Sequence, residues 1–238
     1  MNHSILEELN DLGFSRIENF YSQKEVDLMV GIIDQIGKEN DNFRKSTELF
    51  AVRQFLKEVP QIKDLIINKE FKLMVNRLLG PNNFILKSIY FDKPERSNWF
   101  VGYHQDLTIS VDRKMNLENY GPWTIKNNQF SVQPPIEFLE NITTFRIHLD
   151  PTDKDNGALK VIPGSHQKKI IRTESSEFKN DKELICEIGL GGIMLMKPLI
   201  LHGSNRTKNG KRRRVIHIEI ANLELPNPLN WSEKIPLN

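Results

Sequence analysis

The chain changes its sequence pattern at Gly80-Pro81, and this change limits the folds that it can form. Before this point, apolar residues recur at helical spacing, most clearly from Val26 to Ile36. After it, short alternating runs of apolar and polar residues are separated by turn signals such as Asn156-Gly157. Helices followed by many short strands predict a mainly β protein with added helices (α+β). We expect a β-sandwich or jelly roll whose N-terminal helices pack on one sheet.

The same patterns predict the individual elements. We expect helices at 4–11, 22–37 and 61–79, and a short helix at 135–141. We expect strands at 14–17, 84–91, 99–106, 107–111, 143–149, 158–162, 187–196, 199–202 and 212–221, with loops at 39–48, 112–134 and 167–181. Because no linker or repeat divides the sequence, we predict one domain over 1–238, with helical support at 1–80, a β core at 81–222 and a coil tail at 223–238.

Composition argues against several classes of protein. With 38% hydrophobic and 27% charged residues, the 238-residue chain has the apolar content of a globular domain. The longest apolar run, at 188–196, is too short to span a bilayer, and a formal net charge of +2 does not favour nucleic acid. Cys186 is the single cysteine, so no internal disulfide can form. We therefore expect a cytoplasmic protein without nucleic-acid or membrane partners, as a monomer or weak homodimer.

The stretch Tyr103-His104-Gln105-Asp106 places a histidine and an aspartate two positions apart. On a strand, side chains at this spacing point to the same face. An imidazole beside a carboxylate is two-thirds of the 2-His-1-carboxylate triad, which holds Fe(II) and leaves coordination positions open. The spacing alone is a weak signal, and by itself it favours a pair of side chains on a surface strand.

The C-terminal strands supply a second histidine and a reason for the open positions. His202 ends one predicted strand, and a return strand folds the chain back beside it. The polar face of this return strand carries Arg213, Val215, His217 and Glu219. Isoleucines occupy its other face, which should pack on the helices while the polar face lines a cavity. Arg146 and His148 share a polar face on strand 143–149 in the same way. Buried guanidinium groups need an anion, which a dicarboxylate cosubstrate would supply.

Together and in this order, the motifs resemble the phytanoyl-CoA dioxygenase family of Fe(II)- and 2-oxoglutarate-dependent oxygenases, and the resemblance covers nearly the whole chain. The motifs that carry it are Gly13-Phe14, His104-Gln105-Asp106, Asn156-Gly157-Ala158-Leu159, Pro163-Gly164-Ser165-His166, and His202-Gly203-Ser204 with Arg213 eleven residues after the histidine.

This resemblance implies a double-stranded β-helix, a cupin-like jelly roll, in which iron is held by His104, Asp106 and His202. The implied activity hydroxylates a C–H bond of a small-molecule metabolite, consumes O2 and 2-oxoglutarate, and releases succinate and CO2. Because related halogenases lack the carboxylate ligand, Asp106 favours hydroxylation over halogenation. The alternatives are a non-redox, cupin-like metal-binding isomerase or metabolite sensor, and a basic interaction module at 208–214.

The resemblance also implies a set of contacts to the cosubstrate. Arg213 would pair with the distal carboxylate of 2-oxoglutarate, helped by the hydroxyl of Ser204, and Gln105 would contact the cosubstrate beside the metal. Arg146 departs from the family, in which an aromatic residue is common at this place. It would contact either the cosubstrate or an acidic substrate. Further candidates for contacts to the cosubstrate are Tyr90 and Lys93.

Overall fold

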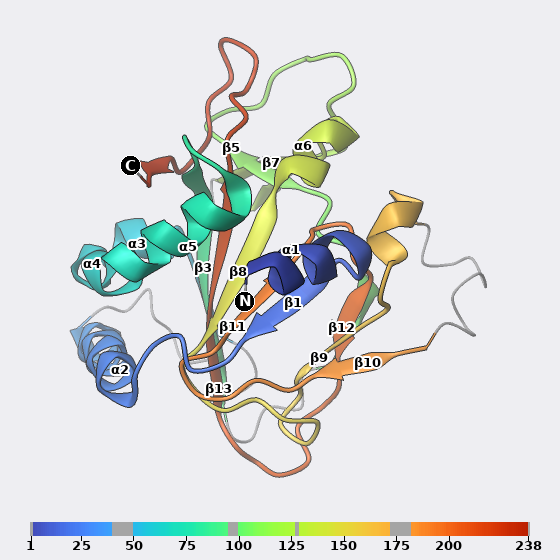
Figure 1. Ribbon diagram of the computed structural model, residues 1–238. Helices are drawn as coiled ribbons and strands as arrows, with labels where there is room; N and C mark the ends of the chain where they lie inside the picture. The colour runs from blue at the N-terminus through green and yellow to red at the C-terminus, as the bar shows by residue number, and fades with distance from the viewer. Residues whose placement is uncertain (1, 40–49, 95–99, 127–128, 172–181, 238) are drawn as a thin grey trace.

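Figure 1 shows the computed structural model, which describes residues 2–39, 50–94, 100–126, 129–171 and 182–237. Within these ranges a seven-stranded antiparallel sheet runs through the middle of the molecule. Its order is β1 (Phe14–Ile17), β11 (Ile193–Met196), β8 (Thr143–His148), β13 (Arg213–Ala221), β3 (Phe84–Lys93) and β14 (Ile235–Pro236), with β2 (Phe50–Arg53) also paired to β3.

Two smaller sheets complete the β structure of the described residues. The four-stranded sheet has the order β10 (Leu184–Cys186), β9 (Leu159–Val161), β12 (His202–Ser204) and β4 (Val101–His104). The three-stranded sheet has the order β5 (Ile109–Val111), β7 (Gln129–Val132) and β6 (Trp123–Lys126). Side chains from all three sheets line one cavity, so the large sheet forms one wall and the smaller sheets form the other. This arrangement confirms the predicted jelly roll with added helices.

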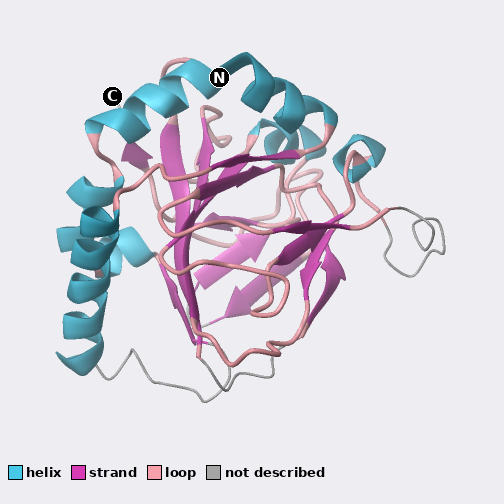
Figure 2. Ribbon diagram, turned by 60° about the horizontal axis from the view of Figure 1, so that its bottom comes forward, coloured by secondary structure: helices cyan, strands magenta, loops and turns pink. Residues whose placement is uncertain are grey.

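The helices cover the side of the large sheet that faces away from the four-stranded sheet (Figures 1 and 2). They are α1 (Asn2–Asp11), α2 (Gln23–Glu39), α3 (Phe55–Glu58), α4 (Lys63–Ile66) and α5 (Lys69–Leu79), with a 3-10 turn at Pro60–Ile62. The described residues also contain a 3-10 turn at Ser165–Lys168 and the separate α6 (Ile136–Asn141). Met29 and Phe71 of the helices are buried in one cluster with Phe145, Ile216 and Ile218 of the sheet. Among the described residues, no helix is both long and apolar enough to cross a membrane.

The alternation along β13 gives the large sheet its two different faces. Ile216, Ile218 and Ile220 are buried on the helix side, whereas Arg213, His217 and Glu219 line the cavity. The predicted assignment of the two faces is therefore confirmed. Burial of the isoleucines against the helices stabilises this register, because a slip by one residue would exchange the two faces.

A capping box begins α2, as expected from Ser22. The amide of Glu25 donates to the Ser22 hydroxyl at 3.3 Å, and the Ser22 amide donates to the Glu25 carboxylate at 2.8 Å. The helix does not end at Gly37 but continues through Glu39. A single glycine inside a helix costs only about 1 kcal/mol relative to alanine, so the remaining turns can outweigh it.

Several elements differ from their predicted bounds. β3 continues to Lys93, two residues past the predicted end, because Asp92 and Lys93 pair with β13. Region 112–134, predicted as a loop, contains the paired strands β6 and β7. The tail is not all coil, since β14 pairs with β3. The predicted loop at 39–48 lies, apart from its first residue, outside the described residues.

Candidate active site

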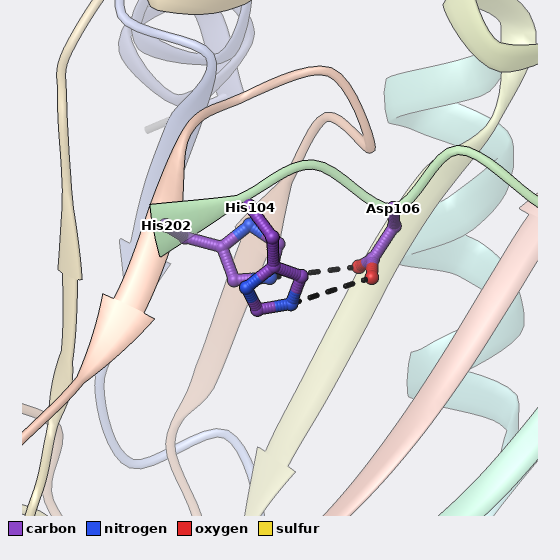
Figure 3. Close-up of side chains that lie close together, drawn as sticks. All are labelled: His104, Asp106 and His202. Atoms are coloured by element: carbon purple, nitrogen blue, oxygen red, sulfur yellow. Dashed lines mark ion pairs between the residues drawn. The ribbon is translucent and has the colours of Figure 1, made fainter. Parts of the chain in front are cut away.

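Two histidines face each other across the ladder between β4 and β12. His104 is the last residue of β4, His202 is the first of β12, and their Cα atoms are register partners. The ring centroids lie 4.3 Å apart (Figure 3). Gly203 permits this close pairing, because a Cβ there would lie only 2.8 Å from the carbonyl oxygen of Val101.

The nearby carboxylate comes from the chain just beyond β4. The strand ends at His104, and the amide of Asp106 donates to the carbonyl of Pro198 at 2.9 Å. The expectation that both residues lie on one strand is therefore wrong, but their side chains still converge. Carboxylate oxygens of Asp106 lie 4.0 Å from Nε2 of His104 and 3.7 Å from Nε2 of His202. One possible ligand atom from each of the three residues lies within 4.8 Å of the others.

Backbone carbonyls orient both imidazoles. Nδ1 of His104 lies 2.9 Å from the Gly102 carbonyl oxygen, and Nδ1 of His202 lies 3.0 Å from that of Ile200. A carbonyl can only accept, so each Nδ1 carries the hydrogen and each Nε2 keeps its lone pair. This is the tautomer in which a histidine binds a metal through Nε2.

Burial and neighbouring charges determine the ionisation states of His202 and Asp106. Burial lowers the pKa of His202 to about 4, although the charge of Asp106 opposes this change. Burial tends to raise the pKa of Asp106, but His202, His217 and Lys87 outweigh it and lower this pKa to about 2. Near neutral pH the site therefore offers a neutral His202 imidazole and an ionised carboxylate.

This donor set fits Fe(II). Two imidazole nitrogens and one carboxylate oxygen are the ligands of the facial triad that leaves coordination positions open. A cavity of about 410 Å³ adjoins the three side chains, so further ligands have room beside them. These residues could therefore hold iron together with small molecules.

Arg213 and Lys93 form a cationic end of this cavity. They are register partners on β13 and β3, and both line the cavity. The Arg213 guanidinium donates to the Gly157 carbonyl, and the Lys93 ammonium donates to the Asn205 carbonyl at 3.1 Å. Burial, followed by the charge of Arg213, lowers the pKa of Lys93 to about 8, and burial also lowers the pKa of Arg213. Two neighbouring cations that are costly to bury fit an anionic group such as a carboxylate.

Gly157 brings the backbone close to both cations. Its φ of +82° is a conformation that L side chains rarely adopt, and a Cβ there would lie 2.8 Å from the Asn205 oxygen and 2.9 Å from Lys93 Nζ. Glycine is therefore required at position 157 of the Asn156-Gly157 motif for steric reasons at this end of the cavity. Ser204, two residues after His202, also lines the cavity.

A chain of polar side chains crosses the cavity wall from Arg146 to Lys87. The Arg146 guanidinium donates to Nδ1 of His217 at 3.1 Å, so Nε2 of His217 donates to Glu219 at 3.1 Å. Glu219 pairs with the Lys87 ammonium at 2.8 Å. Arg146 therefore faces the cavity as expected. His148, by contrast, contacts the Thr152 hydroxyl at 2.7 Å and is absent from the described cavity lining.

Gln105 and Tyr90 lie away from the described lining of the cavity. The side-chain amide of Gln105 donates to the Leu199 carbonyl at 2.5 Å and accepts from the Ile171 amide at 2.8 Å, so it ties two loops together. Tyr90 stacks on Phe55 in the helix-side core, with 5.3 Å between ring centroids. Of the predicted cosubstrate residues, the structure brings Arg213, Ser204, Lys93 and Arg146 to the cavity but not these two.

The return strand does not form a hairpin with the strand of His202. β12 pairs with β4 and β9, whereas β13 pairs with β3 and β8 in the large sheet. The chain from His202 to Arg213 therefore passes from one wall of the cavity to the other. The three arginines of the basic stretch 208–214 have different environments. Arg212 pairs with Asp92, Arg214 pairs with Asp150, and Arg213 lines the cavity.

Sequence reasoning missed several contributions to the cavity. They include Lys87, Arg53 and Glu233, and the strands β6 and β7, which supply Thr124 and Ser131. The alternation of Trp123 and Ile125 with polar residues, repeated at 129–132, was a usable strand signal.

Comparisons with known proteins agree with this geometry. The family model described as Phytanoyl-CoA dioxygenase (PhyH) matches residues 9–215. A curated relative from Stutzerimonas stutzeri, named "Probable alpha-ketoglutarate-dependent hypophosphite dioxygenase", is 25% identical over 244 residues, which cover 90% of this chain and 76% of the relative.

Solved structures show the same fold at low sequence identity. The apoform of EctD from S. alaskensis has a TM-score of 0.72 and 16% identity, over 96% of this chain and 80% of that one. SnoK from nogalamycin biosynthesis, described as a non-heme alpha ketoglutarate dependent carbocyclase, has a TM-score of 0.69 and 14% identity, over 94% and 85% of the two chains. With the family match over most of its length, the chain belongs to the phytanoyl-CoA dioxygenase family of Fe(II)- and 2-oxoglutarate-dependent oxygenases.

Proposed function

We propose that this protein hydroxylates a C–H bond of a small-molecule metabolite, with consumption of O2 and 2-oxoglutarate and release of succinate and CO2. The observation that carries the proposal is the convergence of His104, Asp106 and His202 on a cavity that also holds Arg213 and Lys93. A metal site that only bound a metal would not need two cations buried beside it.

Each of the three ligand side chains has a defined role in this proposal. The Nε2 atoms of His104 and His202 and a carboxylate oxygen of Asp106 would hold Fe(II). Bound Fe(II) supplies the activation of O2, which no amino-acid side chain performs. The backbone carbonyls at Nδ1 hold both rings in the required tautomer.

Arg213 and Lys93 orient the cosubstrate. Arg213 can bind the distal carboxylate of 2-oxoglutarate through two N–H groups, and Lys93 adds a second positive charge at the same end of the cavity. Ser204, on the opposite wall, adds a hydroxyl donor. The keto acid group is thereby directed toward the three ligands.

The test is succinate formation from 2-oxoglutarate by Fe(II)-loaded protein in a library of small metabolites, with 2-oxoglutarate binding measured in parallel. We expect Arg213→Leu to weaken 2-oxoglutarate binding at least tenfold, because a charged bidentate contact is lost. Lys154→Met, a change of an exposed basic residue on a turn, is the control. Metal binding that is indifferent to 2-oxoglutarate, with wild-type behaviour in Arg213→Leu, would instead support the non-redox alternative.

A second candidate reaction is hydroxylation at a P–H bond. The name of the S. stutzeri relative specifies hypophosphite, and that relative aligns over 90% of this chain. Hypophosphite therefore belongs in the succinate assay beside the organic metabolites. Formation of phosphite together with succinate would favour this reaction over C–H hydroxylation.

A further inference from the structure

One wall of the cavity is a face of hydroxyl groups. Ser110, Ser131 and Thr124 are register partners across β5, β7 and β6, so their side chains form a row on one side of the sheet. All three line the cavity, and Thr108 lines it beside them. We call Thr108, Ser110, Thr124 and Ser131 the hydroxyl face.

The other side of the same sheet is apolar. Ile109, Val111 and Val132 are buried in a cluster that includes Leu139 and Trp231. Strand alternation therefore directs every apolar side chain of β5 and β7 away from the cavity. The core accounts for the apolar positions, but it does not account for polar side chains at the cavity positions of these strands, which are Ser110, Thr124, Gln129 and Ser131. A polar ligand would account for them.

Lys87 lies at the edge of the hydroxyl face. Its ammonium donates to the Thr108 carbonyl at 3.0 Å and pairs with Glu219 at 2.8 Å, and its side chain is only 14% exposed. Lys87 is six residues from Lys93 on β3, which places their Cα atoms roughly 20 Å apart along the strand. The two lysines therefore mark opposite ends of the cavity.

The stretch between the two ends carries both apolar and polar side chains, because His217 is the register partner of Ile89 and Arg146 is that of His217. Ile89 and Phe91 lie between the lysines on the cavity side of β3, and Val215 lies opposite Phe91 on β13. A cosubstrate at Arg213 and Lys93 therefore leaves the hydroxyl face for another molecule. Thr108, whose carbonyl accepts from Lys87, is two residues from Asp106, so this end also adjoins the proposed metal ligands.

The charges of the cavity favour an anion. The cationic side chains among its described lining residues are Arg53, Lys87, Lys93, Arg146 and Arg213. The carboxylates are Asp106, Glu219 and Glu233. Fe(II) and dianionic 2-oxoglutarate cancel one another, so the net charge of the described lining residues, which is positive, favours an anionic substrate over a cationic one.

Arg146, one of these cations, supports the same conclusion through its hydrogen bonds. It is 8% exposed, its guanidinium donates to a neutral acceptor on His217, and its Nε has no hydrogen-bond partner among the described residues. A buried guanidinium group without a carboxylate hydrogen-bonded to it is costly unless an anion approaches.

We infer that the hydroxyl face and Lys87 form the substrate site, and that the substrate is a compact anion rich in oxygen atoms. The anionic oxygens would accept hydrogen bonds from the hydroxyl groups and Lys87, with the reacting bond directed toward Asp106 and the two histidines. This inference rests on the proposed function, because it assigns the substrate of that same site.

The test uses the full chain loaded with Mn(II) and saturated with 2-oxoglutarate under anaerobic conditions. Binding of methylphosphonate, a compact oxyanion, is compared by calorimetry with binding of glycerol, a neutral polyol of similar size. We expect methylphosphonate to bind at least tenfold more tightly. Lys87→Met should weaken it by about tenfold or more and Ser131→Ala by about fivefold, in line with charged and neutral hydrogen bonds.

Lys160→Met is the matched control. Lys160 is also a strand lysine, paired with Glu183 at 2.8 Å and 15% exposed, but it is not among the cavity residues. Its methylphosphonate affinity should stay within twofold of wild type. If Lys87→Met fails to fold because Glu219 is left unpaired, the double variant Lys87→Met/Glu219→Gln removes both charges and should show the same loss.

The outcomes separate the two proposals. Wild-type protein that binds 2-oxoglutarate but binds methylphosphonate no better than glycerol refutes this inference alone. Unchanged methylphosphonate binding in both the double variant and Ser131→Ala refutes it as well. Failure of the wild-type protein to bind Mn(II) and 2-oxoglutarate overturns the proposed function and this inference together.

Discussion

If 2-oxoglutarate binds at Arg213 and Lys93 as proposed, the lowered pKa of Lys93 should make its affinity depend on pH in a defined direction. Burial and the charge of Arg213 bring this pKa to about 8. The ammonium is charged below that value and loses its charge as the pH rises through it. 2-Oxoglutarate keeps both negative charges over this range, so its attraction to the cationic end weakens with rising pH.

The size of the effect follows from the pKa. The charged fraction of Lys93 falls from roughly nine-tenths at pH 7 to roughly one-tenth at pH 9, so binding that requires the ammonium weakens about tenfold, or about 1.4 kcal/mol. Above pH 8, each binding event should also take up part of a proton. Calorimetry of Mn(II)-loaded protein at pH 7, 8 and 9, in buffers of different ionisation enthalpy, measures both quantities.

Lys93→Met isolates the lysine from other titrating groups, such as metal-bound water. The variant should bind 2-oxoglutarate at pH 7 about as weakly as the wild type does at pH 9, and it should lack the lysine's part of the pH dependence. The reasoning is refuted if Lys93→Met loses affinity with pH as steeply as the wild type, or if wild-type affinity is constant from pH 7 to 9.

Three further predictions concern single residues. Asp106→Ala should abolish hydroxylated product and weaken metal binding, as measured by mass spectrometry and Mn(II) titration, because one of the three proposed metal ligands is lost. Gly157→Ala should lower the free energy of unfolding in urea by at least ~1 kcal/mol, since alanine is strained at a φ of +82°. The control Gly31→Ala, in α2 with open space around it, should raise this free energy by up to ~1 kcal/mol. Tyr90→Phe should leave the KM for 2-oxoglutarate within twofold of wild type, because Tyr90 faces the helix-side core. A large rise in KM would instead show that Tyr90 contacts the cosubstrate.

The sequence predicted best those features that strand alternation controls. The isoleucines of β13 need the helix-side core, so Arg213 and His217 had to face the cavity, and they do. The sequence placed Asp106 near His104 because of their two-residue spacing on one predicted strand, and this reason proved incomplete. β4 ends at His104, and a hydrogen bond to Pro198, far along the chain, positions the carboxylate. Periodicity carries no information about such a contact.

Residues whose roles depend on distant loops were harder to predict. Gln105 neighbours the proposed ligands in sequence, yet its amide is occupied by the backbone at Leu199 and Ile171. Lys87 and the hydroxyl face come from separate strands, and only the packing of the large sheet against the three-stranded sheet brings them together. The pairing of β6 with β7 was concealed by Gly121-Pro122, which suggested a loop before the alternation at 123–132 began.

The passage of the chain from β12 to β13 has a mechanical consequence. His202 belongs to one sheet and Arg213 to the opposite one, so a cosubstrate bound as proposed would connect the iron on one wall with the guanidinium on the other. The bound cosubstrate would contact both sheets and oppose their separation. Succinate keeps the distal carboxylate but lacks the keto group, so this connection between the sheets would be weaker after turnover. Amides of β4 and β12 should then exchange hydrogen more slowly with 2-oxoglutarate bound than with succinate.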